Sequence, residues 1–259
     1  MIYDLQKASI GKRISAFIFD FILFITLAVG AAALVSNALG YDANAERLQE
    51  IQANYFVEHV GSDYIERGVK PGITSAEYGE LSEVDRNAYD KAQKAFGDDA
   101  EANEIYSKLL GYIFLITNLG PLISCIVLEL VIPLFLRNGQ TIGKKIFGIG
   151  VMMQTGVKLN SIALFSRSIL GKYAIETALP LLACTMLLLG SSNLLILAVV
   201  IAIFVINVGL LLFSNKHTVI HDIVSYSVCV DLSSQMIFDT EEDLIDYKNR
   251  VHRENNDLA

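Results

Sequence analysis

The chain has 259 residues and a formal net charge of −8, and 53% of its residues are hydrophobic. Charged residues make up only 19%, whereas soluble domains carry about a quarter. The apolar residues fall in long blocks, and the acidic excess lies in residues 41–110, which carry fifteen acidic and seven basic residues. This pattern predicts an integral membrane protein and excludes a nucleic-acid-binding protein, which needs clustered Lys and Arg on one surface.

Four apolar blocks are each long enough to cross about 30 Å of hydrocarbon as a helix. The first contains Asp20 and is longer than the apolar core of a signal peptide, so we interpret it as a span. Residues 190–193 (Gly-Ser-Ser-Asn) predict a tight turn, which makes the last two spans an antiparallel hairpin. The predicted spans are Ile14–Val35, Gly111–Leu136, Tyr173–Leu189 and Leu194–Phe213.

The distribution of Lys and Arg predicts the orientation. Basic residues precede the first span and recur in the loop 137–172, whereas the acidic segment 41–110 lies between the first two spans. We therefore expect a multi-pass plasma-membrane protein with both termini and the basic loop in the cytoplasm.

The predicted domains follow from the spans. Residues 1–40 hold the N-terminal segment and first span, and 111–230 hold the other three spans. Between them, 41–110 is expected to be a small helical extracytoplasmic insertion, in which Ser82 starts a helix with Asp85 three residues on. The polar tail, 231–259, is expected to be flexible or weakly helical in the cytoplasm. The partner of the insertion is left open.

The loop 137–172 has a different pattern. Ile146–Met153 is apolar and partly β-branched, residues 154–156 (Gln-Thr-Gly) indicate a turn, and Val157–Leu159 can return. This predicts a short β-hairpin at the membrane surface, followed by an interfacial helix that Ser161 caps and that runs through Leu170. The expected fold is thus an all-α membrane protein, a four-helix transmembrane bundle with a helical insertion and a hairpin-like cytoplasmic loop.

Glycines and lysines at 139–145 superficially suggest a phosphate-binding loop. That motif needs four residues between its glycines, and here only three intervene. Lys144 and Lys145 are therefore predicted to contact lipid headgroups.

Ionisable residues inside spans are costly, so they usually face a partner or water. Asp20 is too deep to reach the interface and needs an internal partner, whereas Arg13 can extend towards the cytoplasm. The Asp20 site is either a cation or proton site or a structural contact. Glu129 has no nearby partner in sequence, and Lys172 is expected to pair with Glu176 one turn later. Arg13, Asp20, Glu129 and Glu176 all map to the cytoplasmic half of the bundle, and Asn118 and Asn207 are expected to hold helices together by hydrogen bonds.

His221-Asp222 follows the fourth span. One His-Asp pair lacks the remaining ligands of a metal site, so we expect an anchored turn in which Asp222 pairs with Arg13 or Arg167. The cysteines show no metal-ligand spacing. We expect no metal, no cofactor and no catalytic constellation.

Together these residues resemble the RDD family of bacterial membrane proteins, named for an arginine and two aspartates. Arg13 with Asp20 seven residues on is similar to the family's opening, and Gly139-Gln-Thr-Ile-Gly-Lys144 to its Gly-x-Thr-x-Gly-Lys signature. Arg167 and His221-Asp222 match its later arginine and second aspartate. The resemblance covers about 11–36 and 111–231; the long insertion and a fourth span depart from the simplest family pattern. The family is associated with transport, including sodium–proton exchange, which implies roles for Arg13, Asp20 and Asp222.

The leading hypothesis is a small transporter that exchanges a cation for a proton. Asp20, helped by Glu129, binds the ion, and Arg13 and Asp222, together with Arg167, form a gating or structural ion pair. Four helices make a thin pathway, so a homodimer is expected. The alternatives are a non-transporting scaffold or accessory subunit and, last, an enzyme acting on lipid phosphates; we expect no enzymatic activity.

Overall fold

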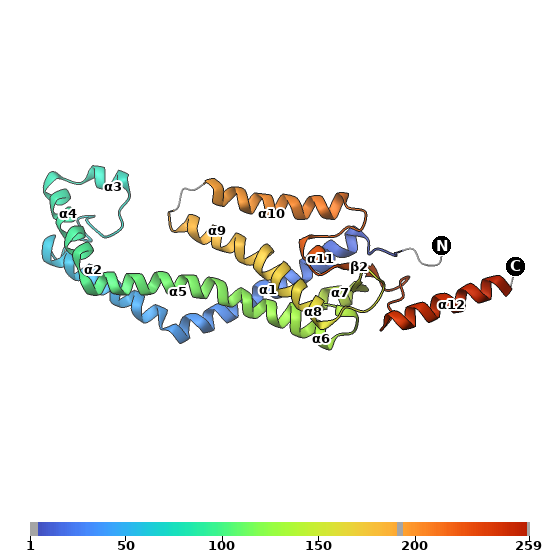
Figure 1. Cartoon of the computed structure of the whole chain (residues 1–259). Coiled ribbons are helices and arrows are strands. Elements are labelled where there is room, and N and C mark those ends of the chain that lie inside the picture. The colour runs from blue at the N-terminus through green and yellow to red at the C-terminus, as the bar shows by residue number, and fades with distance from the viewer. Residues whose placement is uncertain (1–4, 191–193, 258–259) are drawn as a thin grey trace. The chain divides into compact units, whose positions relative to one another are not determined.

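The computed structural model describes residues 5–190 and 194–257, which form helices and one two-stranded sheet (Figure 1). Two compact units are present: Met1–Ala32 together with Thr117–Ala259, and Ala33–Ile116. The first helix, α1 (Ile10–Leu39), and the fifth, α5 (Ala100–Cys125), contribute residues to both units.

Within the described residues, four helices are long and apolar enough to cross a membrane, which confirms the predicted number of spans. The second starts at Ala100 rather than Gly111, and continues from α5 through η1 (Ile126–Val131) and α6 (Ile132–Phe135). Gly120 lets α1 and α5 approach closely, because a Cβ there would meet the Ala28 carbonyl oxygen at 2.8 Å. The four segments are Ile10–Leu39, Ala100–Phe135, Ser161–Leu188 and Leu194–Phe213.

The third span is longer than predicted. It runs from α8 (Ser161–Phe165) through η3 (Ser166–Ala178) to α9 (Leu179–Leu188) without a break. The separate interfacial helix ending at Leu170 was therefore a wrong prediction. Gly171 does not end the helix; it allows close packing against α11 instead, as described below. Its N-cap is Asn160, whose side chain accepts from the Ala163 amide at 2.7 Å, and not Ser161.

Two segments of the spans are π-helical, with hydrogen bonds from residue i to i+5. At the end of η1 the Ile132 amide donates to the Val127 carbonyl, and at the end of η3 the Leu179 amide donates to the Ala174 carbonyl, five residues back in each case. Long π-helices are rare, and single π-turns often occur at functional sites.

The fourth span, α10 (Leu194–Phe213), packs beside α9 (Figure 1). No residue of α10 is buried by the rest of the described chain. The turn predicted at 190–193 falls mostly on residues 191–193, which lie outside the described residues.

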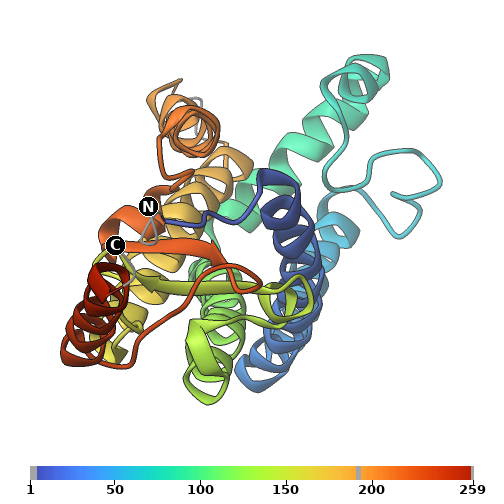
Figure 2. The ribbon, with the colours of Figure 1, turned by 90° about the vertical axis from the view of Figure 1, so that its right-hand side faces the viewer.

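The basic loop contains η2 (Arg137–Gly139), α7 (Ile142–Ile146) and β1 (Ile149–Met153). The predicted hairpin is only partly correct. The Met153 amide does donate to the Val157 carbonyl at 2.9 Å, but the ladder partner of β1 is the distant β2 (Ser227–Asp231), antiparallel, with Ile149 opposite Asp231 (Figure 2). β2 outcompetes the local return because it brings the fully buried Val228 and Val230.

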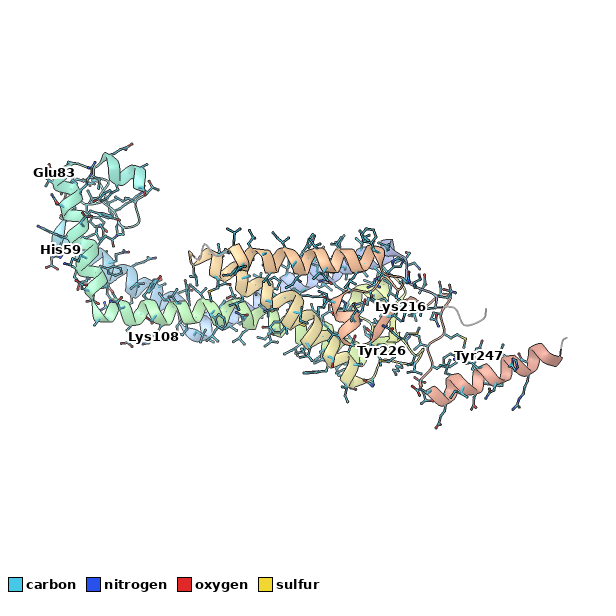
Figure 3. All side chains as sticks on the ribbon, turned by 45° about the horizontal axis from the view of Figure 1, so that its top comes forward. His59, Glu83, Lys108, Lys216, Tyr226 and Tyr247 are labelled. Carbon is cyan, nitrogen blue, oxygen red and sulfur yellow. The ribbon has the colours of Figure 1, made fainter. Side chains whose placement is uncertain are left out.

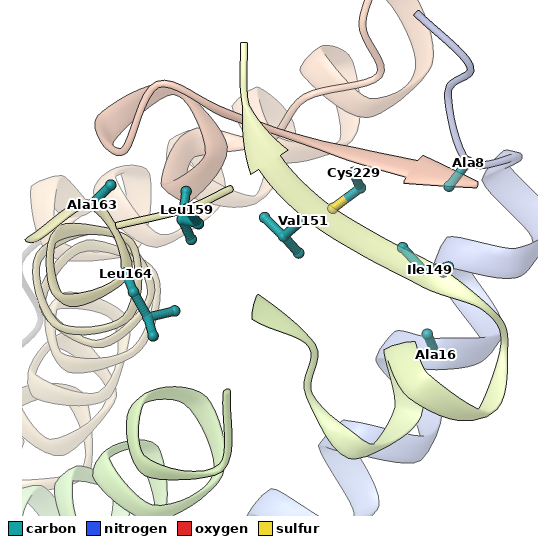
Figure 4. Close-up of a cluster of buried hydrophobic side chains, with 8 residues drawn as sticks. All are labelled: Ala8, Ala16, Ile149, Val151, Leu159, Ala163, Leu164 and Cys229. Atoms are coloured by element: carbon teal, nitrogen blue, oxygen red, sulfur yellow. The ribbon is translucent and has the colours of Figure 1, made fainter. Parts of the chain in front are cut away.

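The sheet helps to organise the core of this unit. The helix α11 (Ile220–Val224) lies between α10 and β2 in the chain. In the loop before it, the Lys216 ammonium donates to the Gln154 side chain at 2.5 Å, and after it Tyr226 has a positive φ of +51° (Figure 3). The buried side chains in Figure 4 join the sheet to α1 and α8: Ala8, Ala16, Ile149, Val151, Leu159, Ala163, Leu164 and Cys229.

The insertion is helical, as predicted. It comprises α2 (Tyr41–His59), α3 (Ser75–Glu80) and α4 (Glu83–Asp98). Residues of α2 and the end of α4 pack with the beginning of α5. Ser82 caps α4, accepting from the Asp85 amide at 3.1 Å. One of its cores surrounds the fully buried Phe56.

The C-terminal segment is more regular than expected. Residues Glu241–Asp257 form α12, and Thr240 starts it with reciprocal side-chain and backbone hydrogen bonds to Asp243. The ring of Tyr247 lies 5.2 Å from that of Phe238, which joins the helix to the preceding segment (Figure 3).

Candidate functional site

A cluster of nine ionisable residues, here called the charged cluster, lies where spans one to three meet α7 and α11. Each predicted charged site residue except Lys145 belongs to it. Its members are Arg13, Asp20, Glu129, Lys144, Arg167, Lys172, Glu176, His221 and Asp222.

Asp222 lies fully buried between two arginines. The Arg13 Nη2 atom is 2.9 Å from its Oδ2, and Arg167 Nη1 contacts its Oδ1, so the predicted pairing is confirmed with both arginines. Burial disfavours the charged carboxylate, but Arg167, His221 and Arg13 outweigh it and hold the pKa of Asp222 well below its usual range. Asp222 therefore stays ionised and ties the first and third spans to α11.

The two arginines are not equivalent. Arg167 also donates to the Ser227 hydroxyl at 2.5 Å and lies 3.8 Å from the Cys229 sulfur, so its guanidinium is held on several sides. Arg13 has a buried Nη1 atom without a hydrogen-bond partner in the described part of the chain. Arg13 is therefore the less firmly held partner of Asp222.

Glu129 pairs across the bundle with Lys172. Glu129 belongs to η1 and is only 6% exposed, and the Ser168 hydroxyl donates to its backbone carbonyl. The expected Lys172–Glu176 pair is not formed. Lys172 lies in the π-helical η3, where the Thr177 hydroxyl donates to its backbone carbonyl at 2.8 Å. Its ammonium contacts Glu129 of the second span instead of Glu176.

Glu176 instead holds His221. Its Oε2 is 2.8 Å from His221 Nδ1, and its Oε1 accepts from the His221 amide at 3.1 Å. Gly171 makes this possible, because a Cβ there would lie 2.7 Å from the His221 Cα. Burial, with Arg167 nearby, lowers the pKa of His221, although Glu176 and Asp222 oppose the shift.

Asp20 is held differently from the other buried carboxylates. Thr141 Oγ1 donates to its Oδ2 at 2.5 Å, and the Gly143 amide donates to its Oδ1 at 2.7 Å. Glu129 and Asp222 have basic partners, whereas among the described residues no basic group lies within ion-pair distance of Asp20. At 8% exposure, Asp20 is a buried carboxylate without a paired cation.

Lys144 is turned towards the cluster instead of the lipid headgroups. Its ammonium lies 3.3 Å from the Thr141 hydroxyl, because Thr141 caps α7 and directs this turn inward. Burial lowers the pKa of Lys144; Glu129 opposes the shift, and Lys172 and Arg167 add to it. Lys145 is exposed, so the headgroup prediction stands for that residue alone.

The polar amides of the spans have separate roles. Asn207 Oδ1 accepts from the Ile220 amide at 3.1 Å, which ties α10 to the start of α11 rather than to another span. The Asn118 backbone carbonyl accepts from the Tyr173 hydroxyl at 3.1 Å, which joins the second and third spans.

Sequence reasoning missed four neutral residues that position the charges: Thr141, Gly143, Ser168 and Ser227. Thr141 and Gly143 lie in the Gly-x-Thr-x-Gly-Lys motif, whose lysine was predicted to contact lipid headgroups. Nothing in the local sequence marks Ser168 or Ser227. In the described ranges, no group of three or more His, Cys, Asp or Glu is placed to hold a metal ion.

One comparison with known proteins found a match. The model of the RDD family matches residues 7–226, a range that includes every member of the charged cluster. No curated protein and no solved structure matches the chain.

Proposed function

Because the chain belongs to the RDD family and has four membrane-spanning helices, we propose that it is a small transporter that exchanges a monovalent cation for a proton at Asp20. The single observation that supports this is the environment of Asp20, a buried carboxylate whose hydrogen bonds within the described residues all come from neutral donors. A charge buried in a span is expensive unless it is paired or neutralised. A proton and a small cation each neutralise the same carboxylate, and therefore compete for it.

Lys172 gives the site its second element. It is paired with Glu129, and it is also close enough to Asp20 for an electrostatic interaction. In this proposal Glu129 holds Lys172 near Asp20 but unpaired with it, so that Asp20 stays available to a proton or a cation. This is the specific form of the helper role predicted for Glu129.

The Arg13–Asp222 pair is the proposed gate of the cytoplasmic side. Arg13 has one nitrogen unsatisfied, so breaking its contact costs less than breaking that of Arg167. In this proposal the chain lies in the plasma membrane with both termini and the basic loop in the cytoplasm, following the distribution of Lys and Arg.

A homodimer completes the proposal. Four helices enclose little space, and no residue of α10 is fully buried by the rest of the described chain. A second copy could cover part of that apolar face and widen the pathway.

The test is ion flux in proteoliposomes with an internal pH dye, under Na⁺, K⁺ or Li⁺ gradients. Wild type is compared with Asp20→Asn and with Asp239→Asn, an exposed acid outside the cluster. We expect cation-dependent proton movement that Asp20→Asn loses and Asp239→Asn retains. Equal absence of flux from well-folded wild-type protein for all three ions would contradict the proposal.

A scaffold or accessory subunit is the second candidate. It is favoured by the insertion, which has its own buried core around Phe56 and an acidic composition suited to a basic partner. Under this alternative Asp20→Asn lowers the amount of folded protein, and no variant changes flux because none exists.

A further inference from the structure

The loop 140–147 holds Asp20 through hydrogen bonds to both of its carboxylate oxygens. We infer that this loop is the gate of the Asp20 site, closed on the empty carboxylate and released when a monovalent cation takes the place of the Thr141 hydroxyl. This inference rests on the proposed function, because it assumes that a cation reaches Asp20.

The hydrogen bonds make closure and cation binding compete at Oδ2. Thr141 donates its hydroxyl proton to Asp20 Oδ2 at 2.5 Å, so the positive end of the O–H dipole points at the carboxylate. A cation that approaches the same lone pair is repelled by that proton. Cation binding at that lone pair therefore displaces Thr141.

The packing at Gly143 holds the loop tightly against α1. A Cβ at Gly143 would lie 2.5 Å from the Ala16 carbonyl oxygen and 2.9 Å from the Asp20 Cγ atom. Ala16 itself is only 2% exposed. The glycine lets α7 lie directly on α1, and we expect this contact to open when a cation binds Asp20.

Thr141 couples the contact to the fold of the loop. The same Oγ1 atom caps α7, accepting from the Lys144 amide at 3.3 Å. α7 is a helix of five residues and depends strongly on its cap. Loss of the Asp20 contact therefore loosens the loop as a unit, which provides a measurable signal.

The test is hydrogen–deuterium exchange of peptides covering 140–147 in the full-length protein in nanodiscs, with Na⁺, Li⁺ or choline as the cation. In wild type, Na⁺ or Li⁺ should accelerate exchange relative to choline. Thr141→Val and Gly143→Ala should exchange about tenfold faster even in choline, the loss expected for a hydrogen bond to a charged group.

Matched variants separate gating from simple destabilisation. Thr141→Ser keeps the hydroxyl and should restore both slow exchange and the cation response. Thr26→Val removes a hydroxyl that bonds within α1, to Ile22 at 2.8 Å, and should leave the loop unchanged. Asp20→Asn should abolish the cation response.

The outcomes distinguish this inference from the proposed function. Cation-accelerated exchange that Asp20→Asn abolishes supports the gate, whether or not proton flux is found. If cations do not change the deuterium uptake of the loop while the same protein transports protons against cations, the gate is wrong and the proposed transport function remains. A loop that ignores cations in protein without flux overturns both.

Discussion

Lys172 of the third span contacts Glu129 of the second, and the pair lies within π-helical segments of both helices. Glu129 is only 6% exposed, so each charge depends on the other for neutralisation. Substitutions at either residue therefore test how much this pair contributes to the packing of the second span against the third.

Lys172→Met should destabilise the protein by about 3–5 kcal/mol, because it leaves a buried carboxylate unpaired. The double variant Lys172→Met with Glu129→Gln should recover most of that loss. Unfolding in detergent with increasing denaturant measures both. If the double variant were as unstable as the single one, the pair would not be the source of the effect.

The two arginines around Asp222 should differ in their effect on stability. Arg167→Met should cost more than Arg13→Met, because Arg167 also donates to Ser227 and lies deeper, at 5% side-chain exposure against 9%. Removal of either partner of a buried pair costs up to about 3–5 kcal/mol. Thermal unfolding of both variants in one detergent decides the order, and a larger loss for Arg13→Met would contradict it.

Gly171→Ala should separate α11 from the third span. The added Cβ would lie 2.7 Å from both the Cα and the Cβ of His221, an overlap that costs about 1–3 kcal/mol. Gly209→Ala in α10 is the control, because nothing lies within 4 Å of its Cβ position and the helix should gain slightly. Equal melting temperatures for the two variants would argue against this packing.

Stability should fall as the pH drops below about 6.5, the ordinary pKa of histidine. Burial lowers the pKa of His221 in the folded state, so the unfolded chain binds more protons below 6.5 and folding is weakened there. Asp222 does not contribute in this window, because its lowered pKa matters only below its usual value of 3.8. Melting temperatures of wild type and His221→Gln between pH 5 and 8 test this; the variant should show a flatter profile.

The insertion should be sensitive at Phe56. Phe56→Ala empties a fully buried site and should cost about 3–5 kcal/mol in that unit. Proteolysis of 41–110 should accelerate, whereas the exposed control Val84→Ala should resemble wild type. Unchanged proteolysis of Phe56→Ala would mean that this core does not hold the insertion together.

The four spans were predictable because hydropathy over about 20 residues is a property of the chain alone. The partners of Asp222 were also foreseen, since a short buried carboxylate after a span needs a basic group. The boundaries of the third span were not, because Gly171 was expected in a loop and instead serves close packing within a helix.

Long-range contacts account for the remaining differences. The pairing of β1 with β2 joins residues 149 and 231, and no local pattern ranks that partner above the nearby return at 157–159. The Lys172–Glu129 contact could not be foreseen either, because its geometry depends on π-helical turns that single-sequence patterns do not reveal.

Those π-helical turns also determine which residues share a face of the third span. Arg167 and Glu176 are nine positions apart. With 3.6 residues per turn, that separation covers about two and a half turns and places the two side chains on opposite sides. With hydrogen bonds from i to i+5 a turn takes roughly 4.4 residues, so nine positions make about two turns and both side chains reach α11. If this segment wound as an ordinary α-helix at its present length, one of these two charges would face away from the bundle, so the wider winding is what keeps both of them beside α11.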